Sequence, residues 1–277
     1  MFQKPAPIGV FDSGYGGLTI LRELRRKLPQ YDFLYLGDNA RTPYGTRSFE
    51  VVYNYTLEAV TYLFGQSCPL VILACNTASA KALRNIQQCD LPHLAPDNRV
   101  LGVIRPCVEK VAELTRNGRV GVLGTPGTVS SMSYPIEFEK WSRGRVTSTV
   151  QHACPMWVPL VENNETDHEG ADYFVQRDLQ LLLEQDPNLD TVVLACTHYP
   201  LLLPSIKRFL PNHLQLVDQG PVVAEKLFEY LIRHSEMEQR LSKGGTVRYL
   251  TTETAANFEA KASLFLGESI SANKVDL

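Results

Sequence analysis

The sequence predicts an α/β protein of two pseudo-symmetric domains, each a mainly parallel sheet flanked by helices, with the active site in the cleft between them. Two observations support this expectation. Short aliphatic runs alternate with amphipathic stretches from end to end, and two parts of the chain resemble each other. Buried aliphatic strands separated by helices are typical of parallel sheets that are covered on both faces.

Hydrophobic periodicity predicts the individual elements along the chain. In the first part we expect strands over 8–11, 33–36 and 70–74, and helices over 18–28, 49–64 and 77–86. In the next part we expect strands over 100–103, 120–123 and 191–195, and helices over 106–115, 170–184 and 202–210. The segment from about Gln215 predicts a strand, a turn and a helix, and the stretches 247–253 and 255–267 complete the chain.

The internal repeat indicates how the two halves are arranged. The segment VILACNTAS (71–79) matches VVLACTHYP (192–200), because in both an aliphatic strand ends in Ala-Cys. Upstream of each, a strand enters a Gly-rich turn, in IGVFDSGYGGLT (8–19) and in VGVLGTPGTVSS (120–131). Ligands of α/β proteins bind at the carboxyl ends of the strands, so two such halves facing each other would share one cleft.

A stretch rich in proline and polar residues, at 95–99, predicts the boundary between the halves. We therefore expect a first domain over residues 1–97 and a second domain over residues 98–212. The segment from about 213 to 277 is expected to return to the first domain and complete it.

Composition and charge exclude several classes of function. With 44% hydrophobic and 21% charged residues, the chain has the composition of an ordinary globular protein. The net charge of −3 and the lack of basic blocks give no reason to expect a nucleic-acid partner. No stretch has the apolar character of a signal peptide or a bilayer span, so we expect no membrane partner and a cytoplasmic location. Because no secretion signal is expected, the six cysteines are not expected to form disulfides. They form no CxxC or HxxC pair, so a metal site is not expected either.

Cys75 and Cys196 are the candidate reactive groups. Each directly follows a predicted aliphatic strand and precedes a predicted helix or turn. A thiol in that position lies beside backbone N–H groups that lower its pKa. A structural role is an equally good interpretation of either cysteine alone, but two cysteines in matching contexts favour reactivity. The other four are expected to be small buried hydrophobic residues: Cys68, Cys89, Cys107 and Cys154.

Three ionisable residues could assist these thiols. Asp12 ends the first predicted strand, where it is either a helix N-cap or a carboxylate that helps to deprotonate Cys75. His198 follows Cys196 by two residues and is its natural base partner, although a lone histidine is more often structural. Glu162 would by default be a solvated loop carboxylate, and spacing alone does not select it.

Dinucleotide binding is a competing hypothesis for the first Gly-rich turn. Gly14 and Gly16 follow a strand, and Asp38 ends the next strand, as in a dinucleotide fingerprint. However, Thr19 occupies the third glycine position, and Asp12 would place negative charge beside a pyrophosphate. NAD is therefore not expected.

Pyridoxal chemistry is also not expected. A pyridoxal enzyme needs a Schiff-base lysine, and neither cysteine motif contains one. Lys81 is the nearest candidate, and its place in the periodicity predicts the surface of a helix.

Taken together, these motifs resemble the glutamate racemases. The resemblance rests on six segments that span most of the chain: GVFDSGYGGLT, GDNARTPYGTRS, LACNTASA, GVLGTPGTV, CPMWVPLVE and LACTHYPLL. It implies two pseudo-symmetric α/β domains, no cofactor and no metal, with Cys75 and Cys196 as catalytic cysteines. It also implies that Asp12, Glu162 and His198 are assisting acids and bases. The substrate contacts that it implies are Asp12, Ser13, Tyr44, Gly45, Asn76, Thr77, Thr125, Thr128, Thr197 and His198.

The resemblance further implies a reaction. One cysteine would remove the Cα proton of glutamate, and the opposed cysteine would return a proton to the other face. Cys75 would handle the proton of D-glutamate and Cys196 that of L-glutamate, supplying D-glutamate for peptidoglycan. An aspartate racemase remains an alternative because it would use the same mechanism with two cysteines. A non-catalytic amino-acid binding protein is a less favoured alternative. A homodimer is compatible with the sequence.

Overall fold

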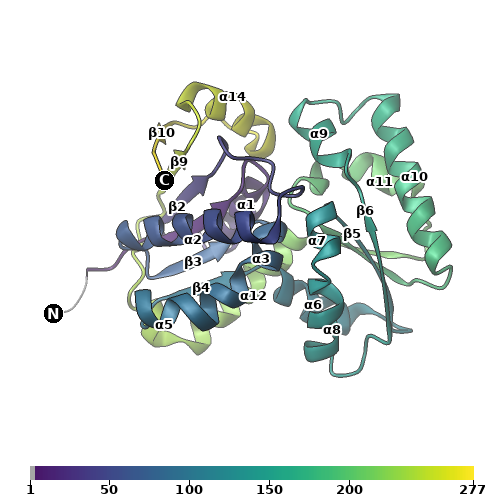
Figure 1. Cartoon of the computed structure of the whole chain (residues 1–277), viewed down its shortest axis with the longest axis horizontal. Coiled ribbons are helices and arrows are strands. Elements are labelled where there is room, and N and C mark those ends of the chain that lie inside the picture. The colour runs from purple at the N-terminus through teal and green to yellow at the C-terminus, as the bar shows by residue number, and fades with distance from the viewer. Residues whose placement is uncertain (1–3) are drawn as a thin grey trace.

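The computed structural model describes residues 4–277, so residues 1–3, the start of the expected first domain, lie outside the described part. Its named strands form two separate sheets of six and four strands, and all their pairings are parallel. Figure 1 shows the six-stranded sheet on the left and the four-stranded sheet on the right, each surrounded by helices. The α/β prediction is confirmed.

The six-stranded sheet has the order β10-β9-β2-β1-β3-β4. Its strands are β1 (Ile8–Asp12), β2 (Phe33–Gly37), β3 (Leu70–Leu73), β4 (Arg99–Gly102), β9 (Val247–Thr251) and β10 (Ala272–Lys274). The three central strands are buried along their whole length, because aliphatic and aromatic residues occupy both of their faces. The helices of this half are α1 (Gly17–Lys27), α2 (Phe49–Gly65), α3 (Asn76–Lys81), α4 (Leu83–Asn85), α5 (Leu91–Leu94), α12 (Gln219–Arg233), α13 (Ser235–Glu238) and α14 (Ala255–Leu266).

The four-stranded sheet has the order β6-β5-β7-β8. Its strands are β5 (Arg119–Gly124), β6 (Ser148–Ala153), β7 (Thr191–Ala195) and β8 (Gln215–Val217). Its helices are α6 (Ile104–Leu114), α7 (Pro126–Ser130), α8 (Ser133–Trp141), α9 (Trp157–Glu162), α10 (Glu169–Gln185) and α11 (Leu203–Phe209), the last preceded by the 3₁₀ turn η2 (Tyr199–Leu202).

The two sheets repeat one strand order. In the first, β1 lies between β2 and β3, and β3 pairs with β4; in the second, β5 lies between β6 and β7, and β7 pairs with β8. The strands that precede the two candidate cysteines, β3 and β7, therefore occupy equivalent places. Each pairs with the strand that enters a Gly-rich turn, β1 or β5. The sequence repeat thus corresponds to a structural repeat.

The expected domain limits differ from the sheets at two strands. The strand expected to open the second domain, β4, instead pairs with β3 in the first sheet. The segment from about 213 was expected to return to the first domain, but β8 pairs with β7 in the second sheet, and only β9 and β10 join the first. The proline-rich stretch marks a surface turn within the first half, where Asn98 N–H donates to the carbonyl of Ala95. Such turns occur within domains as well as between them.

The region between β5 and α10 was not predicted in detail. Strand β6 has only partly buried residues, because it lies at the edge of its sheet and lacks an aliphatic run. The helix expected over 77–86 is interrupted after Lys81 and continues through a π-helical turn, Ile86–Asp90.

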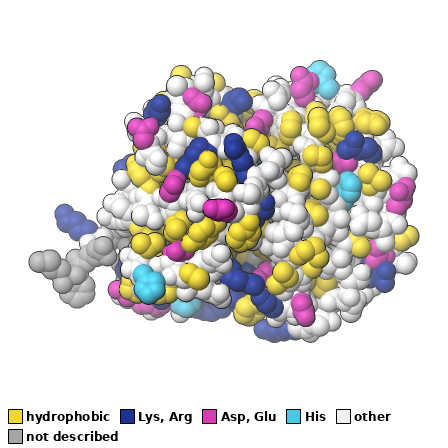
Figure 2. All heavy atoms as spheres, in the orientation of Figure 1, with side chains coloured by type: hydrophobic (Ala, Val, Ile, Leu, Met, Phe, Trp, Pro, Cys, Tyr) yellow, Lys and Arg dark blue, Asp and Glu magenta, His cyan; other side chains and the backbone are white. Residues whose placement is uncertain are grey.

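Within residues 4–277, none of the helices is long and apolar enough to cross a membrane. On the face shown in Figure 2, basic side chains are interspersed with acidic ones.

Candidate active site

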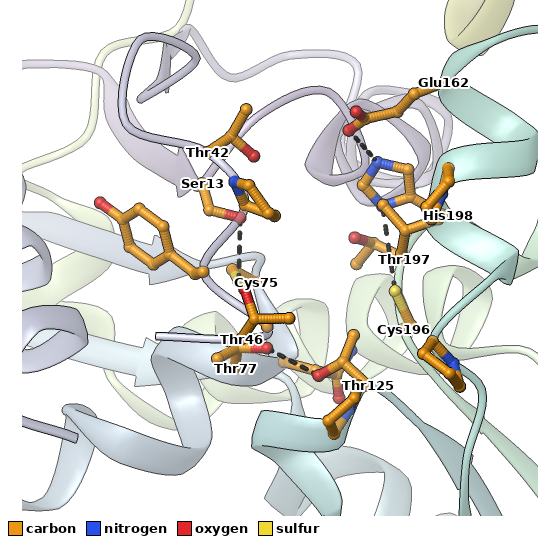
Figure 3. Close-up of a pocket in the computed structure, with 18 of the residues that line it drawn as sticks. Ser13, Thr42, Thr46, Cys75, Thr77, Thr125, Glu162, Cys196, Thr197 and His198 are labelled. Carbon is orange, nitrogen blue, oxygen red and sulfur yellow. Dashed lines mark hydrogen bonds and ion pairs between the residues drawn. The ribbon is translucent and has the colours of Figure 1, made fainter. Parts of the chain in front are cut away.

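A cavity of about 260 Å³ lies between the two sheets, and residues from both halves line it. Cys75 and Cys196 face it from opposite sides, as Figure 3 shows. Glu162 and His198 lie above Cys196 in this view, and Ser13 lies above Cys75. The structure therefore brings together the two cysteines that the sequence repeat singled out.

The backbone explains why both thiols reach the cavity. Strand β3 ends at Leu73, and the amide of Ala74 still donates to the carbonyl of Phe11 in β1 at 2.7 Å. Cys75 is then the N-cap of α3, and its sulfur accepts a hydrogen bond from the amide of Ala78 at 3.4 Å. Cys196 directly follows Ala195, the last residue of β7.

The pKa of Cys75 moves in the direction opposite to the one expected. Burial raises the pKa of this thiol to about 12, and the negative charge of Asp12 adds to the effect. Hydrogen bonds with Ser13, whose hydroxyl lies 3.4 Å from the sulfur, and with the Ala78 amide lower it, but less. The helix N-terminus acts as predicted, and desolvation of the thiolate outweighs it.

Asp12 ends β1 and is buried beside the Gly-rich turn. Its carboxylate accepts a hydrogen bond from the amide of Gly14 at 2.9 Å, much as an N-cap would. It is also fully buried, and that burial raises its pKa, although the charge of His198 and the backbone N–H groups of Gly17 and Gly14 act against this. Asp12 is thus a buried acidic group on the Cys75 side of the cavity.

On the Cys196 side, His198 links the sulfur to a carboxylate. Its Nδ1 lies 3.9 Å from the sulfur of Cys196, and its Nε2 lies 2.9 Å from Oε1 of Glu162. Burial lowers the pKa of His198, but hydrogen bonds to Cys196 and Glu162 outweigh burial and raise it to about 10. Burial likewise raises the pKa of Glu162, and the hydrogen bond and charge of His198 bring it below its usual value. The two side chains therefore form an imidazolium–carboxylate pair.

Glu162 is not the solvated loop carboxylate that its position in the sequence suggested. It is the last residue of α9, and its side chain is only 19% exposed because it packs against His198. The two thiols consequently differ in their neighbours: a carboxylate lies beside Cys75 and an imidazolium beside Cys196.

Most of the expected substrate contacts line the cavity. These are Asp12, Ser13, Tyr44, Gly45, Asn76, Thr77, Thr125, Thr197 and His198. Thr128 does not belong to this lining; it is fully buried, and its hydroxyl lies 3.1 Å from that of Thr125 and 3.4 Å from that of Thr77. Thr128 therefore supports two lining residues from behind.

Asn76 is held by a buried network that the sequence did not suggest. Its side-chain amide donates to Gln219 at 2.5 Å, and its side-chain oxygen accepts from Gln219 at 3.1 Å and from the hydroxyl of Tyr134 at 2.9 Å. Gln219 begins α12 and Tyr134 lies in α8, so two distant segments fix one side chain of the cavity. Residues so far apart in the chain carry no common sequence signal.

The Gly-rich turn brings the two halves into close contact. A Cβ atom at Gly16 would overlap the hydroxyl of Thr197 and the imidazole of His198. The hydroxyl of Thr19 donates to the carbonyl of Thr197 at 2.9 Å. Asp38, which resembled the acidic residue of a dinucleotide site, is buried and accepts hydrogen bonds from Arg41, among others. The close contact with Thr197 and His198 explains Gly16 without a phosphate ligand.

Two further expectations are wrong. Lys81 is buried rather than on a helix surface, and its ammonium group donates to the carbonyl of Arg47 at 2.7 Å. Cys89 is exposed, whereas a buried residue was expected. Cys154 is buried as predicted, but it also lines the cavity. Among the described residues, one group of side chains could hold a metal ion. It consists of Cys154, His152 and Asp178, whose potential ligand atoms lie within 4.8 Å of one another.

Comparison with known proteins identifies the family. A sequence model described as Asp/Glu/hydantoin racemase matches residues 18–227. The chain belongs to this family. The glutamate racemase of Persephonella marina is 39% identical to the chain, over 98% of the chain and 97% of the relative.

Solved structures of this racemase family share the fold. The glutamate racemase isoform RacE1 from Bacillus anthracis superposes with a TM-score of 0.89 at 34% identity, covering 99% of each chain. The glutamate racemase from Francisella tularensis, in a complex with D-glutamate, superposes with a TM-score of 0.86 at 29% identity, covering 98% of each chain.

Proposed function

We propose that the protein interconverts L- and D-glutamate by moving the Cα proton between Cys75 and Cys196. The observation that carries this proposal is the position of the two thiols on opposite walls of one cavity. Inverting a stereocentre by proton transfer requires removal from one face and return to the other, which two opposed acid/base groups accomplish directly. The similarity to glutamate racemases over nearly the whole chain supports glutamate as the substrate.

The neighbours of the two thiols suggest the starting state for L-glutamate. Cys75, beside the Asp12 carboxyl group and with its raised pKa, enters as the thiol. Cys196, beside the His198 imidazolium, enters as the thiolate. The thiolate of Cys196 takes the Cα proton, so an S–H bond forms as the C–H bond breaks. Cys75 then gives its own proton to the opposite face and becomes the thiolate, ready to act on D-glutamate.

The electron pair left on Cα must be stabilised while neither proton is attached. It spreads into the substrate carboxylate, which gains negative charge as the C–H bond breaks. The side chains of Asn76, Thr77 and Thr197 line the cavity and can donate hydrogen bonds to that carboxylate. Donors fixed before the reaction favour such a charge, because they need no reorganisation as it develops.

The assisting groups act on the two sides of the cavity. Asp12 can exchange a proton with Cys75 or with the substrate amino group, and its raised pKa suits that role. His198 keeps a proton beside Cys196, and Glu162 holds the imidazole in place. The proposal includes supply of D-glutamate for peptidoglycan, as the resemblance implies, and a cytoplasmic location, as the apolar pattern of the sequence led us to expect.

A racemisation assay tests the proposal and separates it from aspartate racemisation. The purified protein is incubated with L-glutamate or L-aspartate, and the circular dichroism signal of the amino acid is followed over time. We expect loss of the signal with glutamate and a much slower loss with aspartate. Preferred loss with aspartate would replace the substrate assignment, and no loss with either would leave an amino-acid binding protein.

Cysteine variants test the assignment of the thiols in the same assay. Cys75→Ala and Cys196→Ala should each remove racemisation while the protein stays folded. Cys89→Ser is the matched control, because Cys89 is exposed, and its activity should equal that of the parent protein. An active variant at Cys75 or Cys196 would contradict the two-thiol assignment.

A further inference from the structure

Three potential metal ligands meet between β6 and α10, next to the wall of the cavity. His152 lies in β6 and Cys154 directly follows that strand, two residues further on. Side chains two residues apart in an extended segment point to the same side. Asp178, from the buried face of α10, meets them there, since His152 Nε2 lies 3.3 Å from its Oδ1.

The donor atoms are close enough to share one ion. One atom each from His152, Cys154 and Asp178 lies within 4.8 Å of the other two. Zinc–ligand bonds of about 2.0–2.3 Å in a tetrahedron place neighbouring donor atoms roughly 3.3–3.8 Å apart. Nε2 of His152 already lies 3.3 Å from Oδ1 of Asp178, and the ion would take Oδ2, the other oxygen of the same carboxylate. Because the donor atoms lie within 4.8 Å of one another, they must approach by about 1 Å to reach this spacing.

An unpartnered oxygen of Asp178 provides an independent observation. Oδ1 lies 3.3 Å from Nε2 of His152. It also accepts two hydrogen bonds from the guanidinium group of Arg177, at 2.7 and 3.0 Å. Oδ2 is buried and has no hydrogen-bond partner, and the side chain of Asp178 is 0% exposed. A buried carboxylate oxygen without a partner is costly and rare in folded proteins. A cation bound to Oδ2 would satisfy it without displacing Arg177.

We propose that His152, Cys154 and Asp178 bind one Zn²⁺ ion. Imidazole nitrogen, thiolate sulfur and carboxylate oxygen are the ligand types that zinc takes in proteins, and a water molecule would complete the tetrahedron. The thiol of Cys154 releases its proton to solvent when the ion binds. The ion would tie the edge strand β6 to α10 behind the wall that Cys154 contributes to the cavity. The ion would take no part in the proposed racemisation, which uses Cys75 and Cys196. The sequence did not predict this site, because the chain has no CxxC or HxxC pair.

Cobalt binding tests the proposal, because Co²⁺ occupies zinc sites and reports on its ligands. The full-length protein, freed of metals with a chelator, is titrated with Co²⁺ and then with Zn²⁺ as a competitor. We expect one equivalent of Co²⁺ per chain, with a thiolate-to-metal charge-transfer band and the visible absorption of a tetrahedral ion. Zinc should displace it stoichiometrically. The absence of a one-equivalent thiolate band would overturn the proposal.

Variants locate the metal. Cys154→Ser should remove the charge-transfer band, and His152→Gln should weaken Zn²⁺ binding by at least about 100-fold, because even groups outside the ligand set change affinity by about 10–100-fold. Cys89→Ser is the matched control and should bind as the parent protein does, since this exposed thiol lies outside the cluster. Far-ultraviolet circular dichroism checks that each variant is folded.

The catalytic thiols need their own control, because they too could bind Co²⁺. The double variant Cys75→Ser/Cys196→Ser should keep the band and the single equivalent. A band that survives in Cys154→Ser and disappears in this double variant would place the metal in the cavity and overturn the proposal. Racemisation is not part of this readout, so failure of the metal site leaves the proposed function untouched, and the reverse also holds.

Discussion

Nε2 of His198 lies 2.9 Å from Oε1 of Glu162, and this buried pair stands directly behind the sulfur of Cys196. Within residues 4–277, no such pair lies behind Cys75, whose ionisable neighbour is the carboxyl group of Asp12. Two halves with the same strand order thus place different ionisable groups beside their thiols. In the proposed mechanism, this asymmetry makes Cys196 the thiolate before L-glutamate binds.

His198→Asn and Glu162→Gln should lower kcat/KM by roughly 10²- to 10⁴-fold, the usual range for loss of a proton-transfer assistant. The fall should be equal in the two directions, because the enantiomers have equal free energy in water. The asymmetry should appear in isotope effects instead. In both variants, the kinetic isotope effect measured with α-deuterated glutamate should increase relative to the parent protein. The increase should be larger for the L-enantiomer, since its proton goes to the thiol beside His198. An equal change for both enantiomers would contradict the assignment of Cys196 to L-glutamate.

The stability of the fold should depend on pH through His198. Its pKa is about 10 in the folded protein against an ordinary value of 6.5, so the folded state binds more protons between these values. The stabilisation is complete below about pH 6.5 and is lost as the pH rises toward 10.

Urea unfolding between pH 6.5 and 9 measures this effect, because above pH 9 buried thiols such as Cys75, with a pKa of about 12, also contribute. The free energy of unfolding of the parent protein should fall across this window. In His198→Asn it should be lower at pH 6.5 and change less. Parallel curves for the two proteins would contradict the ion pair.

The parts of the fold that the sequence predicts are those in which local pattern and burial coincide. The strands β1, β3 and β7 are aliphatic on both faces because helices cover both, so their composition reveals them. Strand β6 lies at an edge and carries a polar sequence, so no such pattern exists. Strand β4 is visible as a strand, but the sheet that it joins depends on tertiary pairing with β3.

The candidate site shows the same limit. Cys75 and Cys196 stand out because the chain repeats their context. Glu162 meets His198 from 36 residues away in the chain, and only the packing of α9 beside η2 brings them together. The pKa of Cys75 follows from burial, which outweighs the local effect of the helix N-terminus and is invisible in a motif.

Gly16→Ala should reduce racemisation severely. The new Cβ would overlap Thr197 and His198, so the imidazole would have to leave its place between Cys196 and Glu162. We expect a fall in kcat comparable to that of His198→Asn. Gly65→Ala is the matched control, because a Cβ there would meet no neighbouring atom, and its activity should be unchanged. Full activity of Gly16→Ala would show that this close contact is not needed.

Gln219→Ala should lower turnover through Asn76. Without the amide of Gln219, the side chain of Asn76 loses two hydrogen bonds and keeps only the one from Tyr134. If Asn76 stabilises charge that develops on the substrate carboxylate, kcat should fall more than KM rises. Gln215→Ala, which removes another glutamine contact far from the cavity, serves as control. Steady-state kinetics that show a change in KM alone would assign Gln219 to substrate binding.

The most direct test of the two-thiol account is the fate of the Cα proton in D₂O. Starting from L-glutamate and stopped early, the reaction should give D-glutamate that carries deuterium at Cα, because its new proton comes from Cys75, which has exchanged with solvent. The remaining L-glutamate should stay almost entirely protiated, since Cys196 tends to return the proton that it removed. A single base acting on both faces would carry much of the original proton into the product. Early D-glutamate that is mostly protiated, measured by mass spectrometry or NMR, would contradict the assignment of opposed roles to Cys75 and Cys196.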